Sequence, residues 1–452
     1  MSDLTELSLT DAARRLRQRS LTAWELARAC LNQIGALDKE INAWETICEE
    51  QALEAAAECD ADAAKGLYRG PLHGIPVGVK DVFLTAGVRT SAGSSVYADF
   101  VPEKDATVVQ RLKSAGAIIL GKTITTELAY LDPAKTRNPW NLEHTPGGSS
   151  SGSAAAVAAR MCFAALGTQT LGSTIRPAAY CGIVGLKPTY GRISRYGMIP
   201  LAQGLDHVGI FARTVADAAL ILEVLAGPDP NDPSCSAMPV PAYTGELVRV
   251  ERIKIGLLKD PFVDRADGDV KAFVLDAVDR FAKAGAQIKI LKPPASLDEV
   301  PHALSVKLAF EAALSGREIL QKHRARLGPN IRELLERGTV ISSEEYQRSE
   351  EVRVSFKQEI NELFSQADCL LLPATPTTAP RGLKSTGDPA FIAPWTFAGL
   401  PQITIPVGLG RNGLPVGVQL IASEFEEAKL IGCARWCESV IDFTHKPRLG
   451  KS

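Results

Sequence analysis

The sequence is organised around TPGGSSSGSAAAVAA (residues 145–159) and GTQTLGSTIRPAAYCG (residues 167–182), two blocks rich in glycine, serine and threonine. Glycine- and serine-rich segments are often flexible linkers. Here, however, the first block runs straight into an alanine-rich helix pattern and then into an apolar strand pattern. A linker would not be embedded in core-forming sequence. We therefore interpret the two blocks as a place where the backbone lies close to a ligand.

The second block predicts a nucleophile beside an oxyanion hole. Successive backbone amides at Thr170, Leu171, Gly172 and Ser173 can point at one spot, which is what an oxyanion hole needs. A serine at the end of such a turn can attack a carbonyl group that is held there. Ser173 is therefore the candidate nucleophile, and it needs a base.

Lys80 is the best-placed candidate base, because it ends the apolar strand pattern GIPVGVKD (residues 74–81). Burial lowers the pKa of a lysine by up to several units and makes a neutral amine available near pH 7. The alternative is an ordinary lysine whose amine reaches water. His73 is one of only six histidines, and the pattern suggests no partner for it. A structural role is the stronger interpretation of His73.

Several motifs together resemble the amidase signature family: GVKD (78–81), PGGSSSGS (146–153), GTQTLGS (167–173) and CGIVGLKP (181–188). The resemblance continues through LDHVG (205–209), RTVAD (213–217), APWTFAGLP (393–401) and GLPVGVQL (413–420), so it covers nearly the whole chain. It implies the fold of that family and the hydrolysis of amides.

The resemblance also implies a catalytic triad, which matches Lys80, Ser149 and Ser173 in this chain. It implies that Ser149 relays a proton between Ser173 and Lys80, and that the peptide bond before Ser149 is cis. The implied reaction is a two-step acyl transfer. Ser173 attacks the amide carbonyl, the amides of residues 170–173 stabilise the oxyanion, and water then hydrolyses the acyl-enzyme.

Three features depart from the usual family pattern and resemble malonamidase-type members: Ser151, Gln169 and the position of Arg176. In those members the equivalent arginine contacts a substrate carboxylate. We therefore predict a substrate-binding group of Arg176, Gly148 and Gln169, with Arg176 pairing with a carboxylate-bearing or otherwise polar amide. The alternative is that Arg176 pairs internally with an acidic residue such as Asp206 and supports the loop.

Strand and helix patterns interleave along the chain without a long polar linker. This favours an α/β fold, a single large domain with a central mixed β-sheet covered by helices on both faces. Strands are expected at residues 74–80, 117–120, 253–258, 287–291, 369–373, 402–406 and 416–421, and helices fill residues 9–65, with Thr10 and Thr22 as N-caps.

We expect residues 1–70 to form an N-terminal helical segment that packs on an amidase signature core of residues 71–452. A mostly helical insert is expected at about 301–364. The acyl pocket is expected between the segment near residues 130–139, the insert around residues 306–317 and the loop around residues 375–394.

Three segments fit the sequence patterns of familiar motifs but lack the structural context that those motifs require. GAIILGKT (116–123) fits a phosphate-binding loop, but its central residues are strand material. GLGRNG (408–413) fits a dinucleotide fingerprint, but Asn412-Gly413 between apolar runs predicts a hairpin turn. GSSSG (148–152) fits a nucleophile elbow without the strand that must precede it, so Ser150 with Asp and His partners is the rival hydrolase interpretation.

Composition narrows the function classes. The 452 residues carry 50 basic and 52 acidic side chains, a balance that argues against a nucleic-acid surface. Nine cysteines form no compact framework, which favours reduced thiols, and Cys433 and Cys437 are interpreted as core residues. No apolar run predicts a signal peptide or a membrane span. We expect a cytoplasmic enzyme that acts on a small-molecule amide, without nucleic-acid or membrane partners, cofactor or metal, and leave a homodimer open.

The leading interpretation is a stand-alone amidase that converts a linear amide to a carboxylate and ammonia or an amine through acyl-Ser173. The alternative is the A-type subunit of a tRNA-dependent amidotransferase complex, which resembles the same family. That subunit normally carries Gly-Gly-Ser-Ile-Arg where this chain has Leu-Gly-Ser-Thr-Ile-Arg (residues 171–176). A non-catalytic binding scaffold is the third option, and the complete set of one lysine and two serines argues against it.

Overall fold

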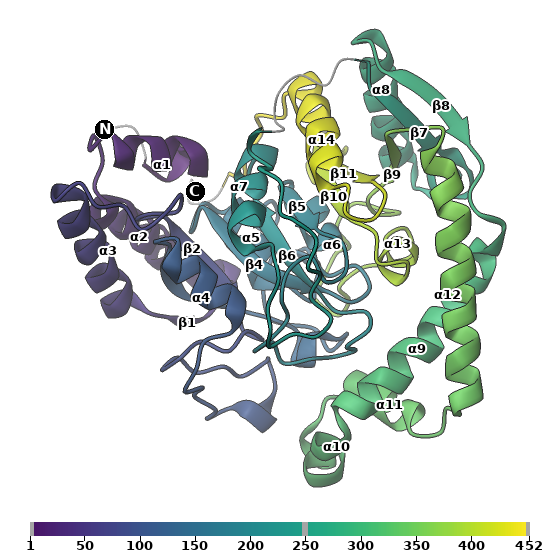
Figure 1. Cartoon of the computed structure of the whole chain (residues 1–452), viewed down its shortest axis with the longest axis horizontal. Coiled ribbons are helices and arrows are strands. Elements are labelled where there is room, and N and C mark those ends of the chain that lie inside the picture. The colour runs from purple at the N-terminus through teal and green to yellow at the C-terminus, as the bar shows by residue number, and fades with distance from the viewer. Residues whose placement is uncertain (1–3, 246–251, 449–452) are drawn as a thin grey trace.

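A mixed sheet runs through the middle of the computed structural model, which describes residues 4–245 and 252–448 (Figure 1). Within these residues the sheet has 11 strands in the order β1-β3-β2-β4-β6-β5-β10-β11-β9-β7-β8. The strands are β1 (Trp44–Ile47), β2 (Pro76–Lys80), β3 (Ile118–Thr123), β4 (Ala164–Gln169), β5 (Val184–Lys187), β6 (His207–Ala212), β7 (Lys254–Leu258), β8 (Gln287–Leu291), β9 (Cys369–Pro373), β10 (Gln402–Leu409) and β11 (Pro415–Ile421).

The helices cover both faces of this sheet, and the predicted α/β class with a mixed sheet is confirmed. They are α1 (Leu9–Arg17), α2 (Ala23–Ile41), α3 (Glu49–Ala64), α4 (Thr107–Ser114), α5 (Ser151–Ala158), α6 (Ile175–Cys181), α7 (Val215–Leu225), α8 (Gly268–Lys283), α9 (Val300–Ser315), α10 (Arg317–His323), α11 (Pro329–Gly338), α12 (Ser343–Phe364), α13 (Ala393–Phe397) and α14 (Glu427–Ile441).

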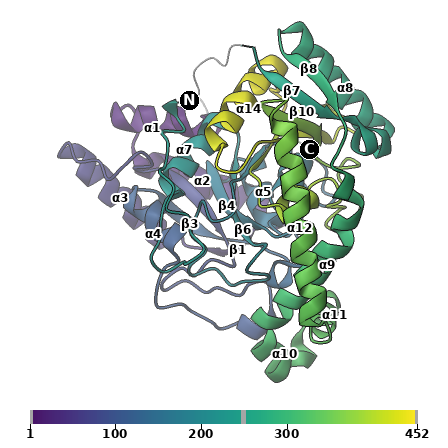
Figure 2. The same cartoon turned by 45° about the vertical axis from the view of Figure 1, so that its right-hand side comes forward.

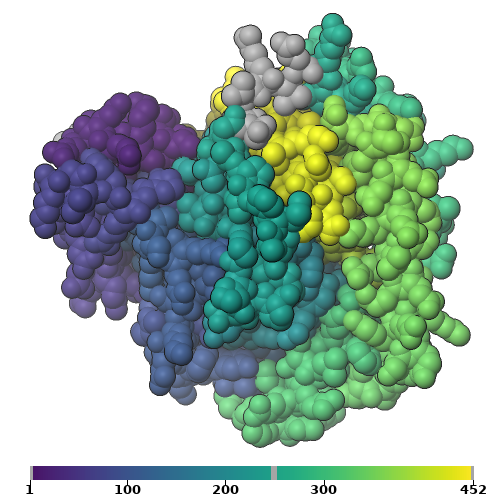
Figure 3. Space-filling view, viewed as in Figure 1, coloured from purple at the N-terminus to yellow at the C-terminus, as the bar shows by residue number. Residues whose placement is uncertain are grey.

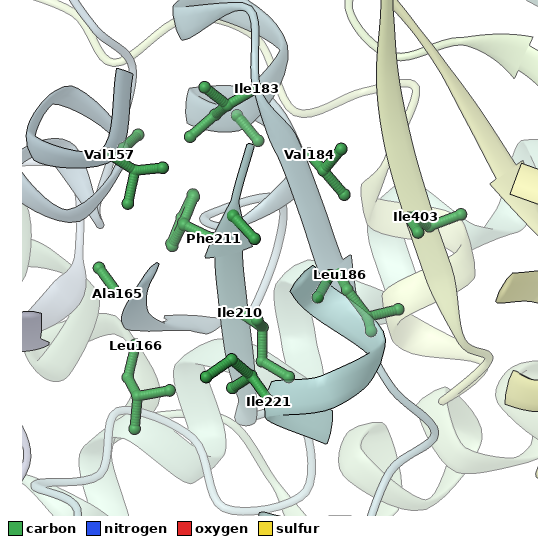
Figure 4. Packing of buried hydrophobic residues seen from close by; sticks show 14 of the residues in the cluster. Val157, Ala165, Leu166, Ile183, Val184, Leu186, Ile210, Phe211, Ile221 and Ile403 are labelled. Carbon is green, nitrogen blue, oxygen red and sulfur yellow. The ribbon is translucent and has the colours of Figure 1, made fainter. Parts of the chain in front are cut away.

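The packing in the centre follows from the alternation of side chains along the strands. Leu166 of β4 pairs in register with Ile210 of β6, whereas the preceding Ala165 pairs with Phe211. Side chains of neighbouring residues point to opposite faces, so each strand serves two layers. Figure 4 shows Ile221 of α7 lying near Ile210, with Val157 of α5 on the other side near Phe211.

The strand order brings two important chain segments to one edge of the sheet. β2 lies between β3 and β4 and is parallel to both. The carboxyl ends of parallel neighbours meet at the same edge. Lys80, the last residue of β2, and Gln169, the last residue of β4, therefore end close to the loop at residues 170–173.

Most elements agree with the sequence prediction, and one of the two expected caps does not. Thr22 caps α2 in a capping box with Glu25, as expected. Thr10 lies inside α1, which Ser8 caps instead, because the helix starts at Leu9. Three strands with no predicted counterpart, β1, β5 and β6, complete the sheet.

The two ends of the molecule are helical. α1, α2 and α3 gather at one end, while α9, α11 and the long α12 form the opposite flank (Figures 1 and 2). In the space-filling view this flank is a continuous green surface (Figure 3). β1 belongs to the predicted N-terminal segment and yet pairs with β3 at the edge of the sheet. The division of the chain at residue 70 stays a prediction.

Candidate active site

Lys80 is fully buried at the end of β2. Its Nζ donates to Ser149 Oγ at 2.8 Å and to Thr168 Oγ1 at 2.6 Å. Burial lowers the pKa of this amine well below 10.5, and the more distant Asp206 carboxylate only partly opposes that effect. The arrangement favours a neutral amine that can accept a proton from a serine hydroxyl.

Ser149 lies in a tight turn that leads into α5. The peptide bond between Gly148 and Ser149 is cis, as the family resemblance implies. Ser151 Oγ closes the turn by donating to the carbonyl oxygen of Gly147 at 2.7 Å. Gly147 has φ +83°, and a Cβ there would lie 2.9 Å from Pro177 Cα. The turn therefore needs glycine at this position, and it holds the Ser149 hydroxyl against Lys80.

The loop after β4 presents free backbone donors. In the part of the chain that the structure describes, the amides of residues 170–173 make no hydrogen bond, and neither does the Ser173 hydroxyl. The next two amides, those of Thr174 and Ile175, both donate to Gln169 Oε1, at 2.9 and 3.0 Å. A row of free amides beside a free hydroxyl is the arrangement that an oxyanion hole and its nucleophile require.

Gln169 supports this loop from below. Its Nε2 donates to Thr396 Oγ1 at 2.9 Å and to Gln402 Oε1 at 2.8 Å. Together with the two amides that its Oε1 accepts, these bonds use every hydrogen-bonding position of the side-chain amide. The fully buried amide has no hydrogen-bonding position left for a substrate, and this geometry argues against the predicted contact of Gln169 with substrate.

Arg176 is buried among neutral oxygens. Its guanidinium donates to the carbonyls of Gly387 and Gly148, at 2.9 and 2.7 Å, and to Thr386 Oγ1 at 3.1 Å. Burial lowers its pKa to about 10. The alternative that paired Arg176 with Asp206 is wrong: Asp206 makes its hydrogen bonds elsewhere, and neutral groups of two loops hold Arg176 instead.

Asp206 is one of two site residues whose role the motifs did not predict, since the sequence suggested it only as a possible partner of Arg176. Its carboxylate accepts from Thr170 Oγ1 at 2.6 Å and from the amides of Leu201 and Ala202, at 2.9 and 3.0 Å. Burial raises its pKa to about 6. Asp206 thus holds the first residue of the free-amide loop from the side. The other is Thr168, whose hydroxyl faces Lys80; its place one residue before the end of β4 was the available signal.

The rival interpretations find no support. Ser150 Oγ accepts from the amide of Thr168 and donates to its carbonyl, both at 3.2 Å, so it serves the backbone rather than a histidine. His207 is buried with Nδ1 2.6 Å from the carbonyl of Leu205, and burial lowers its pKa well below 6.5. Lys122 of GAIILGKT lies in β3 with Nζ 3.1 Å from Asp81.

The hairpin interpretation of GLGRNG is confirmed. β10 and β11 are antiparallel neighbours, and Gly413 has φ +72° in the turn between them.

A cavity of about 350 Å³ adjoins the free-amide loop at Leu171. Its walls are formed by Tyr130, by five residues in the first half of α9 and by residues of the segment from Asp388 to Pro394. Arg337 of α11 completes the rim. Three segments were expected here, and all three contribute. The helical contribution comes from residues 300–308, so only Leu308 falls within the expected range 306–317.

Across residues 4–245 and 252–448, no group of three or more His, Cys, Asp or Glu side chains could hold a metal ion. In the same residues, no helix combines the length and apolar character that crossing a membrane requires. Within the described residues the cysteines form no disulfide with one another, and Cys433 and Cys437 are buried as expected.

The family model described as Amidase matches residues 25–431. The chain belongs to the amidase signature family. It is therefore an enzyme of a hydrolase and amidotransferase family, as the motifs implied. Solved structures agree: the native peptide amidase of Stenotrophomonas maltophilia is 32% identical with a TM-score of 0.87, over 99% of both chains.

A second solved structure is similar to this amidase signature chain. It is described as an unexpected vestigial protein complex that reveals the evolutionary origins of an s-triazine catabolic enzyme. Its matching chain is 31% identical with a TM-score of 0.90, over 98% of this chain and 100% of that one.

The curated relatives point in a more specific direction. The A-type subunit of glutamyl-tRNA(Gln) amidotransferase from Carboxydothermus hydrogenoformans is 37% identical over 99% of both chains. The protein of the same name from Roseiflexus sp. is 39% identical over 99% of both. These relatives favour the alternative, an amidotransferase component, over the stand-alone amidase. Their name includes a tRNA, which agrees with the tRNA-dependent alternative and not with the expectation of no nucleic-acid partner.

Proposed function

We propose that this enzyme hydrolyses a carboxamide C–N bond through an acyl-Ser173 intermediate, with Ser149 and Lys80 as the proton relay. One observation carries the proposal: the buried Lys80 amine lies 2.8 Å from the Ser149 hydroxyl. Its pKa is lowered well below 10.5 by burial. A lysine in that state can act as a base near neutral pH.

The acylation step moves one proton through the two serines. Ser173 Oγ attacks the amide carbonyl while its proton passes to Ser149, whose own proton passes to the neutral Lys80 amine. When the C–N bond breaks, the same path returns a proton to the leaving nitrogen, which departs as ammonia or an amine. A water molecule then attacks the acyl-Ser173 ester and uses the relay again, and the carboxylate product leaves.

The four free amides of Thr170, Leu171, Gly172 and Ser173 are the proposed oxyanion donors. Their positions are held from two sides, by Gln169 through the next two amides and by Asp206 through the Thr170 hydroxyl. Donors that are fixed before the substrate arrives need no reorganisation when negative charge develops on the oxygen. Gln169 and Asp206 are therefore positioning residues rather than groups that touch the substrate.

For Arg176 we favour support of the site over a direct grip on substrate. Its three donor contacts join the carbonyl of Gly148, next to Ser149, to the loop at Thr386 and Gly387. A substrate carboxylate would have to displace these internal acceptors. We propose that Arg176 fixes Gly148, and through it the turn at Ser149. Arg176 and Gly148 then affect the substrate through the shape of this turn rather than by direct contact.

The biological setting has two candidates. The A-type subunit of a tRNA-dependent amidotransferase is favoured by relatives that match 99% of the chain at 37–39% identity. The stand-alone amidase is favoured by the full-length match to a peptide amidase and by the departures at residues 171–176. Gel filtration with candidate partner subunits and tRNA, combined with an amide hydrolysis assay of the chain alone, separates the two. An amidotransferase component should co-elute with these partners and depend on them for turnover, whereas a stand-alone amidase should hydrolyse amides by itself.

Labelling with a fluorophosphonate probe tests the chemistry itself. Wild-type enzyme should bind the probe at Ser173, and Ser173→Ala should bind none. Ser150→Ala is the matched control, since Ser150 lies in the same buried region and is the rival nucleophile. This variant should still be labelled at Ser173. Labelling that survives Ser173→Ala and disappears in Ser150→Ala would contradict the proposed role of Ser173.

A further inference from the structure

The cavity beside Leu171 has an uneven distribution of polarity. Its buried lining residues are all apolar: Val300, Leu304, Leu308, Ala393 and Pro394. Its two charged members, Arg337 and Asp388, are exposed to solvent. The interior therefore offers an oil-like wall, while charge is confined to the rim where water screens it.

The charged rim residues are also engaged with the protein itself. Asp388 Oδ1 accepts from the amide of Ala390 at 2.8 Å, and Arg337 reaches the carbonyl of Ser305 at 3.4 Å. Neither side chain is buried or held out toward the interior as an unpaired charge. Two half-buried lining residues, Tyr130 and Ser305, carry hydroxyl groups, but the buried part of the wall is apolar. A polar group placed against that part of the wall would lose its water without gaining hydrogen bonds, which costs free energy.

The chemistry of the proposed reaction decides which part of the substrate fills the space. In a primary amide the leaving group is ammonia, so the acyl group is the only substituent large enough to occupy a cavity. The cavity adjoins the loop whose amides are the proposed donors to the carbonyl oxygen, through Leu171. Its volume of about 350 Å³ is at the lower end of the range of small-molecule sites.

We propose that the cavity between α9 and the Asp388–Pro394 segment binds an apolar acyl chain, and that the preferred substrates are primary amides of medium-length aliphatic or aryl acids. This inference rests on the proposed function of Ser173. The proposed substrate differs from the carboxylate-bearing amide that was predicted on the assumption that Arg176 binds the substrate directly. Leu304 and Leu308, on one face of α9, are the residues that set the depth of the cavity.

The test is a series of primary amides: acetamide, butyramide, hexanamide and benzamide, with malonamate as the polar member. Each buried methylene favours binding by about fourfold. We expect kcat/KM to rise by about that factor per methylene from acetamide to hexanamide, and malonamate to be among the poorest substrates. A flat series, or a preference for malonamate over hexanamide, overturns the inference.

Two variants locate the effect in the cavity. Leu304→Phe narrows it from α9 and should lower the ratio of kcat/KM for hexanamide to that for acetamide by about tenfold or more. Ala390→Phe narrows the exposed rim, where a larger side chain is tolerated, and should lower the ratio in the same direction even if Leu304→Phe does not fold. Leu314→Phe, at an exposed position of α9 outside the cavity, is the matched control and should leave the ratio unchanged. An unchanged ratio in both cavity variants overturns the proposal.

Failure of this inference can be told apart from failure of the proposed function. An enzyme that is labelled at Ser173 and hydrolyses acetamide as well as hexanamide keeps its proposed chemistry and loses its proposed acyl preference. An enzyme that hydrolyses no amide and is not labelled at Ser173 overturns both.

Discussion

Replacing Lys80 with methionine should change stability and activity in opposite ways that depend on pH. In the folded protein the amine is buried and its pKa lies well below 10.5, whereas in the unfolded chain it titrates near its ordinary value. Between these two pKa values the unfolded state binds one more proton than the folded state. Folding is then penalised, and the penalty grows as pH falls from 10.5 and levels off at the folded pKa.

The slope of this penalty follows from linkage alone. One proton corresponds to about 1.4 kcal/mol per pH unit. Over the pH interval between the folded pKa and 10.5, the free energy of unfolding of the wild type should therefore rise with pH, relative to that of Lys80→Met, by that amount per pH unit. The methionine variant also loses hydrogen bonds to Ser149 and Thr168, but that loss of about 1–3 kcal/mol is independent of pH. The part of the stability difference that changes with pH therefore reports the ionisation of the Lys80 amine alone.

The assay is denaturant unfolding of both proteins across this pH range, together with kcat/KM for an amide substrate. Lys80→Met should lose about 10²- to 10⁴-fold in kcat/KM, the usual contribution of a general base. In the wild type, kcat/KM should rise with pH and level off above the folded pKa of Lys80.

Lys187 provides the matched control for this experiment. It is also fully buried, with Nζ donating to the carbonyls of Pro188 and Leu400 and its pKa lowered to about 7 by burial. Lys187→Met should show a similar pH-dependent difference in stability while retaining amide hydrolysis. If the stability difference for Lys80→Met does not change with pH, the Lys80 amine stays charged in the folded protein and the proposed base mechanism is refuted.

Two further predictions concern the residues around the triad. Arg176→Ala should lower kcat/KM on malonamate and on a neutral amide by the same factor, because Arg176 supports the turn at Gly148; a loss confined to malonamate would instead show a direct carboxylate contact. Asp206→Asn removes a carboxyl whose pKa is raised from 3.8 to about 6. The free energy of unfolding of the wild type should fall, relative to this variant, by about 2 kcal/mol between pH 4 and 6. A pH-independent difference in denaturant unfolding would argue against that burial effect, and kcat should fall more than KM changes if Asp206 positions Thr170.

Local patterns were enough to predict the elements that carry the site. The run ending at Lys80 is strand-like in composition and does form β2, and the second serine-rich block does begin with a strand, β4. Residue type and position singled out Lys80, and the family resemblance singled out Ser149, which the fold brings within 2.8 Å of Lys80. The strands β2 and β4 could be predicted because each is a short apolar run with a polar residue at its carboxyl end, a pattern that can be recognised within a single segment of the sequence.

The hydrogen bonds that support the site could not be predicted in this way, because they join segments far apart in the chain. Gln169 looked like a substrate contact in its motif, but its amide is satisfied by Thr396 and Gln402, more than 220 residues away. Arg176 was expected to need an acid, yet the carbonyls of Gly148 and Gly387 and the Thr386 hydroxyl meet its donors. Only the folded arrangement of β4, β10 and the loop before α13 reveals which acceptors lie within reach.

The contrast between two neighbouring lysines explains why Lys80, and not Lys122, is suited to act as a base. Lys122 lies on β3 beside β2, in register with Val79, and is buried as completely as Lys80. Its Nζ, however, lies 3.1 Å from the Asp81 carboxylate, which favours its charged form and offsets part of the effect of burial on its pKa.

Lys80 has two hydroxyl groups for partners, and its nearest influential carboxylate, Asp206, is already committed to Thr170 and two backbone amides. Hydroxyl partners can either accept from a charged amine or donate to a neutral one, so they leave the protonation state to be set by burial. Moving a carboxylate to position 168 should therefore convert Lys80 into a second Lys122: Thr168→Asp is expected to shift the rise of kcat/KM to higher pH, and Thr168→Ser, which keeps the hydroxyl, is expected to leave it in place.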